Sequence, residues 1–126
     1  MNFFIYKIYY FNGEPAFFKV CTERDYDDYS AVLTSYSLEW EKLDYLKVEG
    51  VNDIPCPSTL NKMIEYAKIL SKPFPFVWVD FYDIKDKVYF GELTFTPAGN
   101  FMSYYKESTL EMMGEKLKLP EKYKFI

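Results

Sequence analysis

The chain has 126 residues, with 15 basic and 19 acidic side chains, no histidine, and 13 Tyr, 12 Phe and 2 Trp. This length predicts one domain, residues 1–126, that can bury a core without disulfides or a structural metal. The lack of histidine excludes Ser–His and Cys–His nucleophile pairs and His-containing zinc sites, and a net charge of −4 with a single arginine argues against a nucleic-acid partner.

The first predicted element is a β-hairpin. Aromatic and β-branched residues run from Phe3 to Phe11, and a second apolar run extends from Ala16 to Cys21. Between them, Asn12-Gly13 supplies the positive φ angles that a tight turn needs. The first run contains Lys7, lacks a cleavage site and is too short to cross a bilayer, so we expect a strand and no transmembrane segment.

The two cysteines do not indicate a metal or redox site. Cys21 and Cys56 are far apart in the sequence and show no CxxC spacing. We therefore expect two buried apolar thiols and a reducing, cytoplasmic compartment.

The middle of the chain predicts a helix. Tyr36, Leu38 and Trp40 alternate as in a strand, and the extended segment 53–57 ends at Ser58, the expected N-cap. Apolar residues at helical spacing then predict an amphipathic helix from about Thr59 to Ser71, with its apolar stripe in the core.

A second hairpin follows the helix. Strand-like runs at 76–84 and 88–95 flank Lys85-Asp86-Lys87, and a turn at 96–100 and a short helix at 108–117 come after them. Together these elements predict an α+β fold with a mostly antiparallel sheet, one long helix and one short helix.

This hairpin holds the candidate site. A three-residue connection places Asp80 opposite Glu92 and Trp78 opposite Thr94, with Phe90 also on that face. Facing carboxylates cost about 0.2–1 kcal/mol, which a divalent cation such as Mg²⁺ would offset. Alternatively, both carboxylates face solvent, or a two-residue turn shifts the register and separates them.

Three segments carry a resemblance to a known family: YKIYYFNGEP, STLNKMIEYAKILSKPFPF and FPFVWVDFYDIKDKVYFGELTFTPAGNF. They resemble the TupA-like branch of the ATP-grasp superfamily, which is named for a teichuronopeptide biosynthesis protein. Members of this branch occur among enzymes of bacterial surface polysaccharide synthesis. The superfamily activates a carboxylate with ATP to form an acyl phosphate, which a nucleophile then attacks.

The resemblance implies roles for five residues. Asp80 and Glu92 match the two acidic Mg²⁺ ligands, and Thr94 stands where many relatives have a ligating Asn. Trp78 stands in place of an Arg that contacts phosphate, and Phe90 matches an apolar residue near the adenine or is a core aromatic. Mg²⁺ and ATP are therefore the implied cofactors, and no catalytic side chain is assigned.

The resemblance covers the C-terminal subdomain of the ATP-grasp fold, without the subdomain that carries the glycine-rich phosphate loop. It implies a truncated or split ligase, inactive alone and completed by a partner chain. Two alternatives remain open: a non-catalytic module that forms a homodimer or binds another protein or a glycan through an exposed aromatic sheet face, and a genomic remnant without activity. The sequence does not indicate the substrate or the acceptor.

Overall fold

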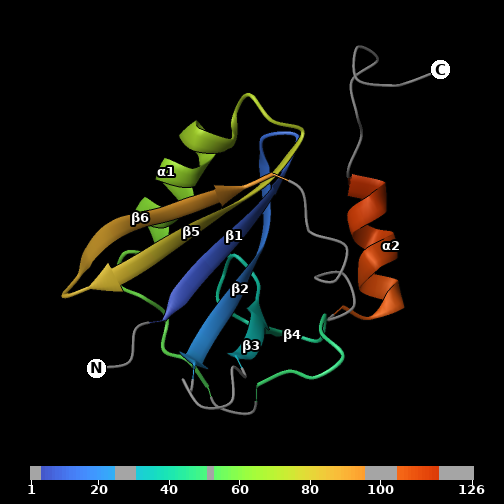
Figure 1. Cartoon of the computed structure of the whole chain (residues 1–126), viewed down its shortest axis with the longest axis horizontal. Coiled ribbons are helices and arrows are strands. Elements are labelled where there is room, and N and C mark those ends of the chain that lie inside the picture. The colour runs from blue at the N-terminus through green and yellow to red at the C-terminus, as the bar shows by residue number, and fades with distance from the viewer. Residues whose placement is uncertain (1–3, 25–30, 51–52, 96–104, 117–126) are drawn as a thin grey trace.

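The computed structural model describes residues 4–24, 31–50, 53–95 and 105–116 (Figure 1). In chain order its elements are β1 (Ile5–Phe11), β2 (Glu14–Arg24), β3 (Ala31–Tyr36), β4 (Lys42–Leu43), α1 (Leu60–Ser71), β5 (Phe76–Ile84), β6 (Lys87–Thr94) and α2 (Glu107–Lys116). The six strands form one antiparallel sheet in the order β4-β3-β2-β1-β5-β6. The predicted α+β fold class is confirmed.

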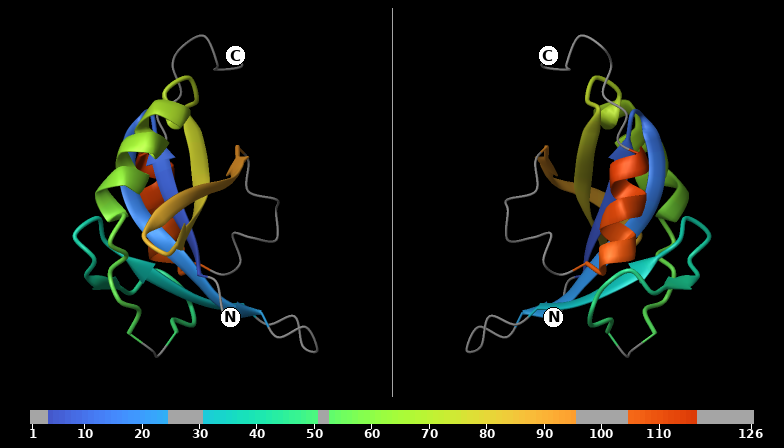
Figure 2. Two further views of the ribbon diagram at one scale, coloured as in Figure 1. Left: turned by 90° about the vertical axis from the view of Figure 1, so that its left-hand side faces the viewer. Right: turned by 90° about the vertical axis from the view of Figure 1, so that its right-hand side faces the viewer.

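The sheet is strongly twisted, and its two faces carry different elements (Figure 2). Helix α1 packs on one face against β5, β1 and β2. Helix α2 contributes Met113 to a core cluster on the opposite face. Neither helix is long and apolar enough to span a membrane.

The first hairpin forms as predicted. Asn12 and Gly13 have φ angles of 52° and 81° and make the two-residue turn between β1 and β2. The register then shifts by one residue between Tyr9 and Tyr10. This irregularity places Lys7 of β1 directly opposite Lys19 of β2.

Helix α1 buries the predicted apolar stripe. Met63 and Ala67 are fully buried against a cluster that includes Val77, Val79 and Phe81 of β5. The odd-numbered face of β5 is therefore the apolar face on which the helix packs, as the sequence predicted.

The predicted N-cap of α1 is wrong. Thr59, not Ser58, occupies the N-cap position, and its side chain makes no capping bond. Instead, Thr59 Oγ1 donates to Asp83 Oδ2 at 2.8 Å, and Ser58 Oγ donates to Asp86 Oδ1 at 2.6 Å. Both hydroxyls connect the start of the helix to the β5–β6 hairpin.

The opposite sheet face is covered, so the expected exposed aromatic face is wrong in its central part. Tyr9, Phe17 and Trp78 are buried in a cluster with Leu46 and Tyr105, and Met113 completes it. Leu46 and Tyr105 form an isolated β-bridge, which brings the chain after β4 and the start of α2 together over this face. The rings therefore build a second core.

Two further predictions need correction. The strand β3 ends at Tyr36, and Trp40 lies beyond it with a φ angle of 68°, folding back to stack on the Tyr36 ring at 4.3 Å. Neither cysteine forms a disulfide, and only Cys21 is buried, since Cys56 is exposed. The predicted turn at 96–100 lies outside the described residues.

Candidate functional site

The connection between β5 and β6 differs from the prediction. Lys85 and Asp86, with φ angles of 53° and 63°, form a two-residue turn, and Ile84 pairs with Lys87. A three-residue connection is therefore wrong. Two successive positive φ angles match the right-handed twist of the flanking strands, which favours this turn in hairpins.

A β-bulge compensates for the shorter turn. Val79 pairs with Leu93 and Phe81 pairs with Phe90, so Gly91 and Glu92 together lie opposite the single residue Asp80. Beyond the bulge, Trp78 pairs with Thr94, as predicted. The extra residue restores the register that the shorter turn had shifted, and it keeps Glu92 beside Asp80.

Four charged residues consequently form a row across four strands. Lys19 of β2 pairs with Lys7 of β1, Lys7 pairs with Asp80 of β5, and Glu92 of β6 lies at the bulge opposite Asp80. Directly paired residues in a sheet point to the same face. We call this set, Lys19, Lys7, Asp80 and Glu92, the charged row; it carries two positive and two negative groups.

Asp80 is the centre of the row. Its side chain is 6% exposed, and Oδ2 accepts a bond from Lys7 Nζ at 2.7 Å. Burial raises the pKa of the Asp80 carboxyl, and nearby Glu92 adds to this effect, although the Lys7 bond opposes it. The other oxygen, Oδ1, is buried and has no hydrogen-bond partner within the described residues.

Lys19 is the second buried charge. Burial, together with repulsion from Lys7, lowers the pKa of its ammonium to about 8. Its Nζ lies 5.2 Å from the Trp78 ring centre, 5.4 Å from that of Tyr9 and 5.5 Å from that of Tyr105. Cation–π contacts with three rings hold this ammonium inside the aromatic cluster.

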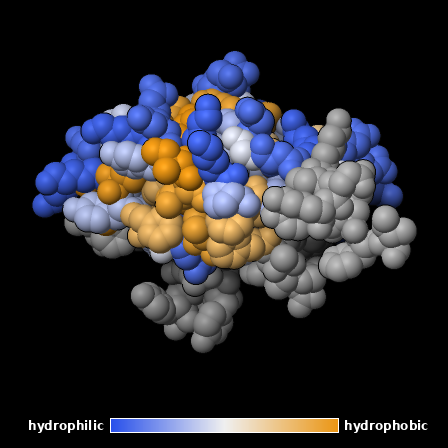
Figure 3. All heavy atoms as spheres, turned by 90° about the horizontal axis from the view of Figure 1, so that it is seen from above, coloured by the Kyte–Doolittle hydropathy of each residue, from blue (hydrophilic) through white to orange (hydrophobic). Residues whose placement is uncertain are grey.

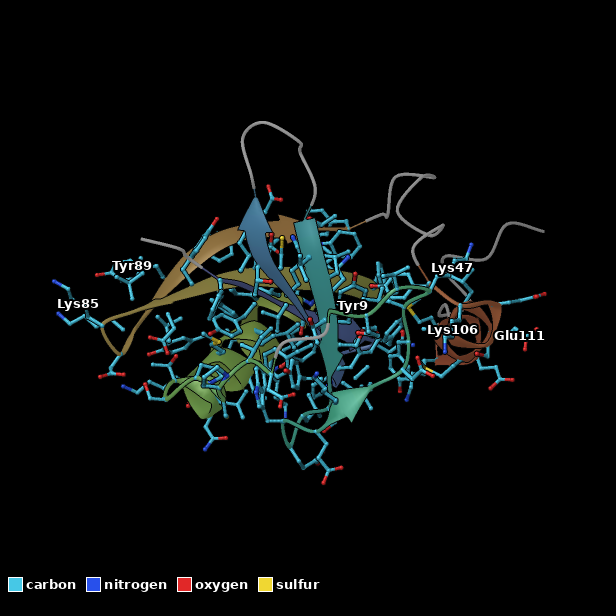
Figure 4. The ribbon with its side chains drawn as sticks, turned by 90° about the horizontal axis from the view of Figure 1, so that it is seen from below. Tyr9, Lys47, Lys85, Tyr89, Lys106 and Glu111 are labelled. Carbon is cyan, nitrogen blue, oxygen red and sulfur yellow. The ribbon has the colours of Figure 1, made fainter. Side chains whose placement is uncertain are left out.

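Tyr9 and Tyr105 add a polar contact to the same cluster. Tyr105 Oη donates a hydrogen bond to Tyr9 Oη, both rings being buried, and Tyr9 lies near the middle of the molecule (Figure 4). Burial raises the pKa of both phenols, so both are neutral at pH 7. They are hydrogen-bonding groups rather than bases.

The other three predicted site residues, Trp78, Thr94 and Phe90, also have defined positions. Trp78 stacks on Tyr9 at 5.1 Å, with Lys7 Nζ 5.9 Å from its ring centre, so it is a core ring next to the charged row. Thr94 pairs with Trp78 and shares the face of the charged row. Phe90 does not share this face: it pairs with Phe81 on the α1 side, because the bulge reverses the alternation of β6.

Lys7 and Lys19 are site residues that the sequence motifs did not predict. The available signal was a single lysine in the middle of each of the two apolar runs of the first hairpin. A lysine flanked on both sides by buried apolar residues needs a partner, since an unpaired buried charge is costly. That partner, Asp80, is 73 residues from Lys7 in the sequence.

The carboxylates fit a hard divalent cation. Asp80 Oδ1 is a buried acceptor that receives no hydrogen bond from any residue the structure describes, and Glu92 beside it is exposed. Mg²⁺ binds through one or two carboxylates and completes its shell with water and phosphate oxygens. Within the described part of the chain, no group of three or more His, Cys, Asp or Glu side chains gathers around a common point.

Comparisons with known proteins give one finding. A family model described as TupA-like ATPgrasp matches residues 4–118, which include the whole charged row. No curated protein and no solved structure matches the chain.

Proposed function

Because this chain belongs to the TupA-like ATP-grasp family, we propose that it supplies the Mg²⁺-binding half of an ATP-grasp ligase site for surface polysaccharide synthesis. In this proposal Asp80 and Glu92 hold the ion, and the hydroxyl of Thr94 is the third protein ligand. The bound ion and ATP would supply phosphoryl transfer to a carboxylate substrate. Residues 1–126 act as a single domain, and a partner chain completes the clamp.

The unpaired Oδ1 atom of Asp80 is the observation that carries this proposal. A buried acceptor with no donor costs free energy unless a ligand or an ion satisfies it. Glu92 is exposed and lies at the bulge opposite Asp80, so a cation held between the two carboxylates would keep contact with solvent and with phosphate oxygens. Lys7 holds the Asp80 carboxylate in one orientation by occupying its other oxygen, Oδ2.

The basic half of the charged row supports binding of an anionic nucleotide. The family resemblance implies that Trp78 stands where relatives have a phosphate-contacting arginine, and the Nζ atoms of Lys7 and Lys19 lie 5.9 and 5.2 Å from its ring centre. The Trp78 indole carries no charge, but the two ammonium groups supply positive charge close to it. Because Lys19 is buried, it acts through its field rather than by contact.

Metal binding can be tested without any enzymatic activity. Mn²⁺ broadens NMR signals of nuclei close to it, so we expect stoichiometric titration of ¹⁵N-labelled protein to broaden amides around Asp80 and Glu92 first. Asp80→Asn and Glu92→Gln should each abolish the selective effect, whereas Asp53→Asn, an exposed carboxylate paired with Lys42, should not. Broadening spread evenly over surface carboxylates, or unchanged in both site variants, would refute the metal site.

Nucleotide binding has its own readout. Trp40 stacks on Tyr36 in the α1-side core cluster, so Trp40→Phe leaves Trp78 as the single indole reporter. We expect ATP with Mg²⁺ to change Trp78 fluorescence weakly, because in this proposal the chain supplies only half of the clamp, and more strongly once a completing partner chain is added. A complete lack of response with the partner present would contradict the ligase role.

A further inference from the structure

The strand β6 leaves one edge of the sheet open. It is the last strand in the sheet order, and within the described residues no strand pairs with its outer side. It has eight residues, and two of its large rings are about half exposed, Tyr89 at 49% and Phe90 at 54%. A long apolar edge strand is a template for pairing with another strand.

A shallow apolar groove lies beside this edge. Its volume is about 340 Å³, and it runs between α1 and β6, lined by Tyr66, Ile69, Leu70, Phe81, Val88 and Phe90. Ile69 is 66% exposed although it lies in the groove. Exposed apolar residues also include Val32, Val48 and Phe95, and apolar side chains gather in a patch on the side of the molecule seen from above (Figure 3).

We infer that the outer edge of β6 is a homodimer interface, in which two copies of this chain pair their β6 strands antiparallel about a two-fold axis through Tyr89. The paired strands would join two six-stranded sheets into one. This inference goes beyond the ligase role and does not depend on it.

The bulge makes β6 complementary to itself. Because Gly91 and Glu92 occupy one position of the ladder, Lys87, Tyr89 and Glu92 share the face of the charged row. Val88 and Phe90 share the α1 face, and both line the groove. In a regular strand Lys87 and Glu92, being five residues apart, would point to opposite faces.

Charge then selects the register. A two-fold axis perpendicular to the sheet places the α1 faces of both copies on one side of the joined sheet and their charged-row faces on the other. Paired residues of the two strands must therefore come from the same face. Centred on Tyr89, the pairing brings Lys87 opposite the bulge position that holds the partner's Glu92, twice per dimer. It also pairs Val88 with the partner's Phe90 and joins the two grooves on the α1 face. Centred on Phe90, the pairing would make neither ion pair.

Molar mass in solution tests the interface. We expect sedimentation of the full chain at micromolar to millimolar concentration to show a monomer–dimer equilibrium. Lys87→Glu should weaken the dimer about tenfold or more, because each pair becomes two like charges. Glu92→Lys should do the same, and combining the two substitutions should restore the dimer, because the ion pairs are then re-formed with reversed sign.

The remaining variants separate the interface from other effects. Phe90→Lys, outside the charged row, places charge in the groove and should also give a monomer, whereas Val48→Lys, at an 84% exposed site elsewhere, should leave the dimer intact. Lys47→Glu is the matched control for the charge change of Lys87→Glu, because Lys47 lies far from the hairpin end marked by Lys85 and Tyr89 (Figure 4). It should leave the dimer intact. Circular dichroism confirms folding of each variant.

Three results would overturn the inference. One is a monomer at every concentration, and another is a dimer that survives both Lys87→Glu and Phe90→Lys. The third is a combined charge swap that stays monomeric while folded. Amide exchange gives an independent check, since protection of β6 amides should rise with protein concentration if the edge is paired.

Discussion

Lys7 and Asp80, on neighbouring strands, form an ion pair of 2.7 Å in which both side chains are largely buried, at 17% and 6% exposed. This pair joins the first hairpin to the second at the centre of the sheet. The Lys7 ammonium neutralises part of the Asp80 charge through Oδ2. The second oxygen, Oδ1, stays available to a ligand such as the proposed cation.

Removing Lys7 should therefore be strongly destabilising. We expect Lys7→Met to lower the free energy of unfolding by about 3 kcal/mol, because it leaves the Asp80 carboxylate buried without its donor. Adding Asp80→Leu should recover part of this loss, since two apolar residues then replace the pair. Urea denaturation measures both. The control Lys42→Met, whose partner Asp53 is 93% exposed, should cause little change.

Gly91 should not tolerate a side chain. A Cβ at this position would lie 3.1 Å from the backbone oxygen of Asp80 and 3.2 Å from its Cβ, and neither atom can move away freely. Gly91→Ala is expected to cost about 1–3 kcal/mol. Alanine at Gly114, where an added Cβ would meet nothing within 4 Å, is the matched control and should not be destabilising. Equal unfolding midpoints for the two variants would contradict the close packing at the bulge.

Stability should rise with pH just above neutrality. The folded pKa of Lys19 is about 8, below the ordinary lysine value of 10.5, so the unfolded chain binds more protons in this range. From pH 7 to pH 9 the gain should be about 1 kcal/mol, before the raised pKa values of Cys56 and of the buried tyrosines reverse the trend.

The lysine itself can be tested in the same experiment. Chemical denaturation at pH 7, 8 and 9 should show the gain in the unmodified chain and not in Lys19→Met. A curve that stays flat in both proteins, or rises equally in both, would show that another group controls the pH dependence.

Glu49 should fix the segment around Leu46, which packs over the second core. Its Oε1 accepts a bond from the Ser35 amide at 2.7 Å, and its Oε2 accepts bonds from the Leu46 and Tyr45 amides at 2.9 and 3.2 Å. We expect Glu49→Ala to cost about 2–3 kcal/mol and to speed exchange of the Leu46 amide. Exchange that is unchanged at Leu46 would mean that packing, not the carboxylate, holds this segment.

The sequence alone determined the elements whose signals are local. Asn12-Gly13 between two apolar runs predicted the first hairpin, and the spacing of Met63 and Ala67 predicted α1 and its buried side. The alternation of residues along the two strand-like runs also predicted that Asp80 and Glu92 lie side by side on adjacent strands. These signals depend on neighbouring residues only, so they could be read without the fold.

Tertiary structure alone decided what surrounds those carboxylates. The two-residue turn shifts the predicted register of β5 and β6 by one residue, and the bulge shifts it back. Trp78 therefore pairs with Thr94 as predicted, whereas Phe90, between the turn and the bulge, lies on the other face. Lys7 pairs with Asp80, and Lys19 lies in the same row, only because β1 lies between β2 and β5 in the sheet. Strand order and bulges depend on packing between distant segments, and such contacts leave no periodic trace in the sequence.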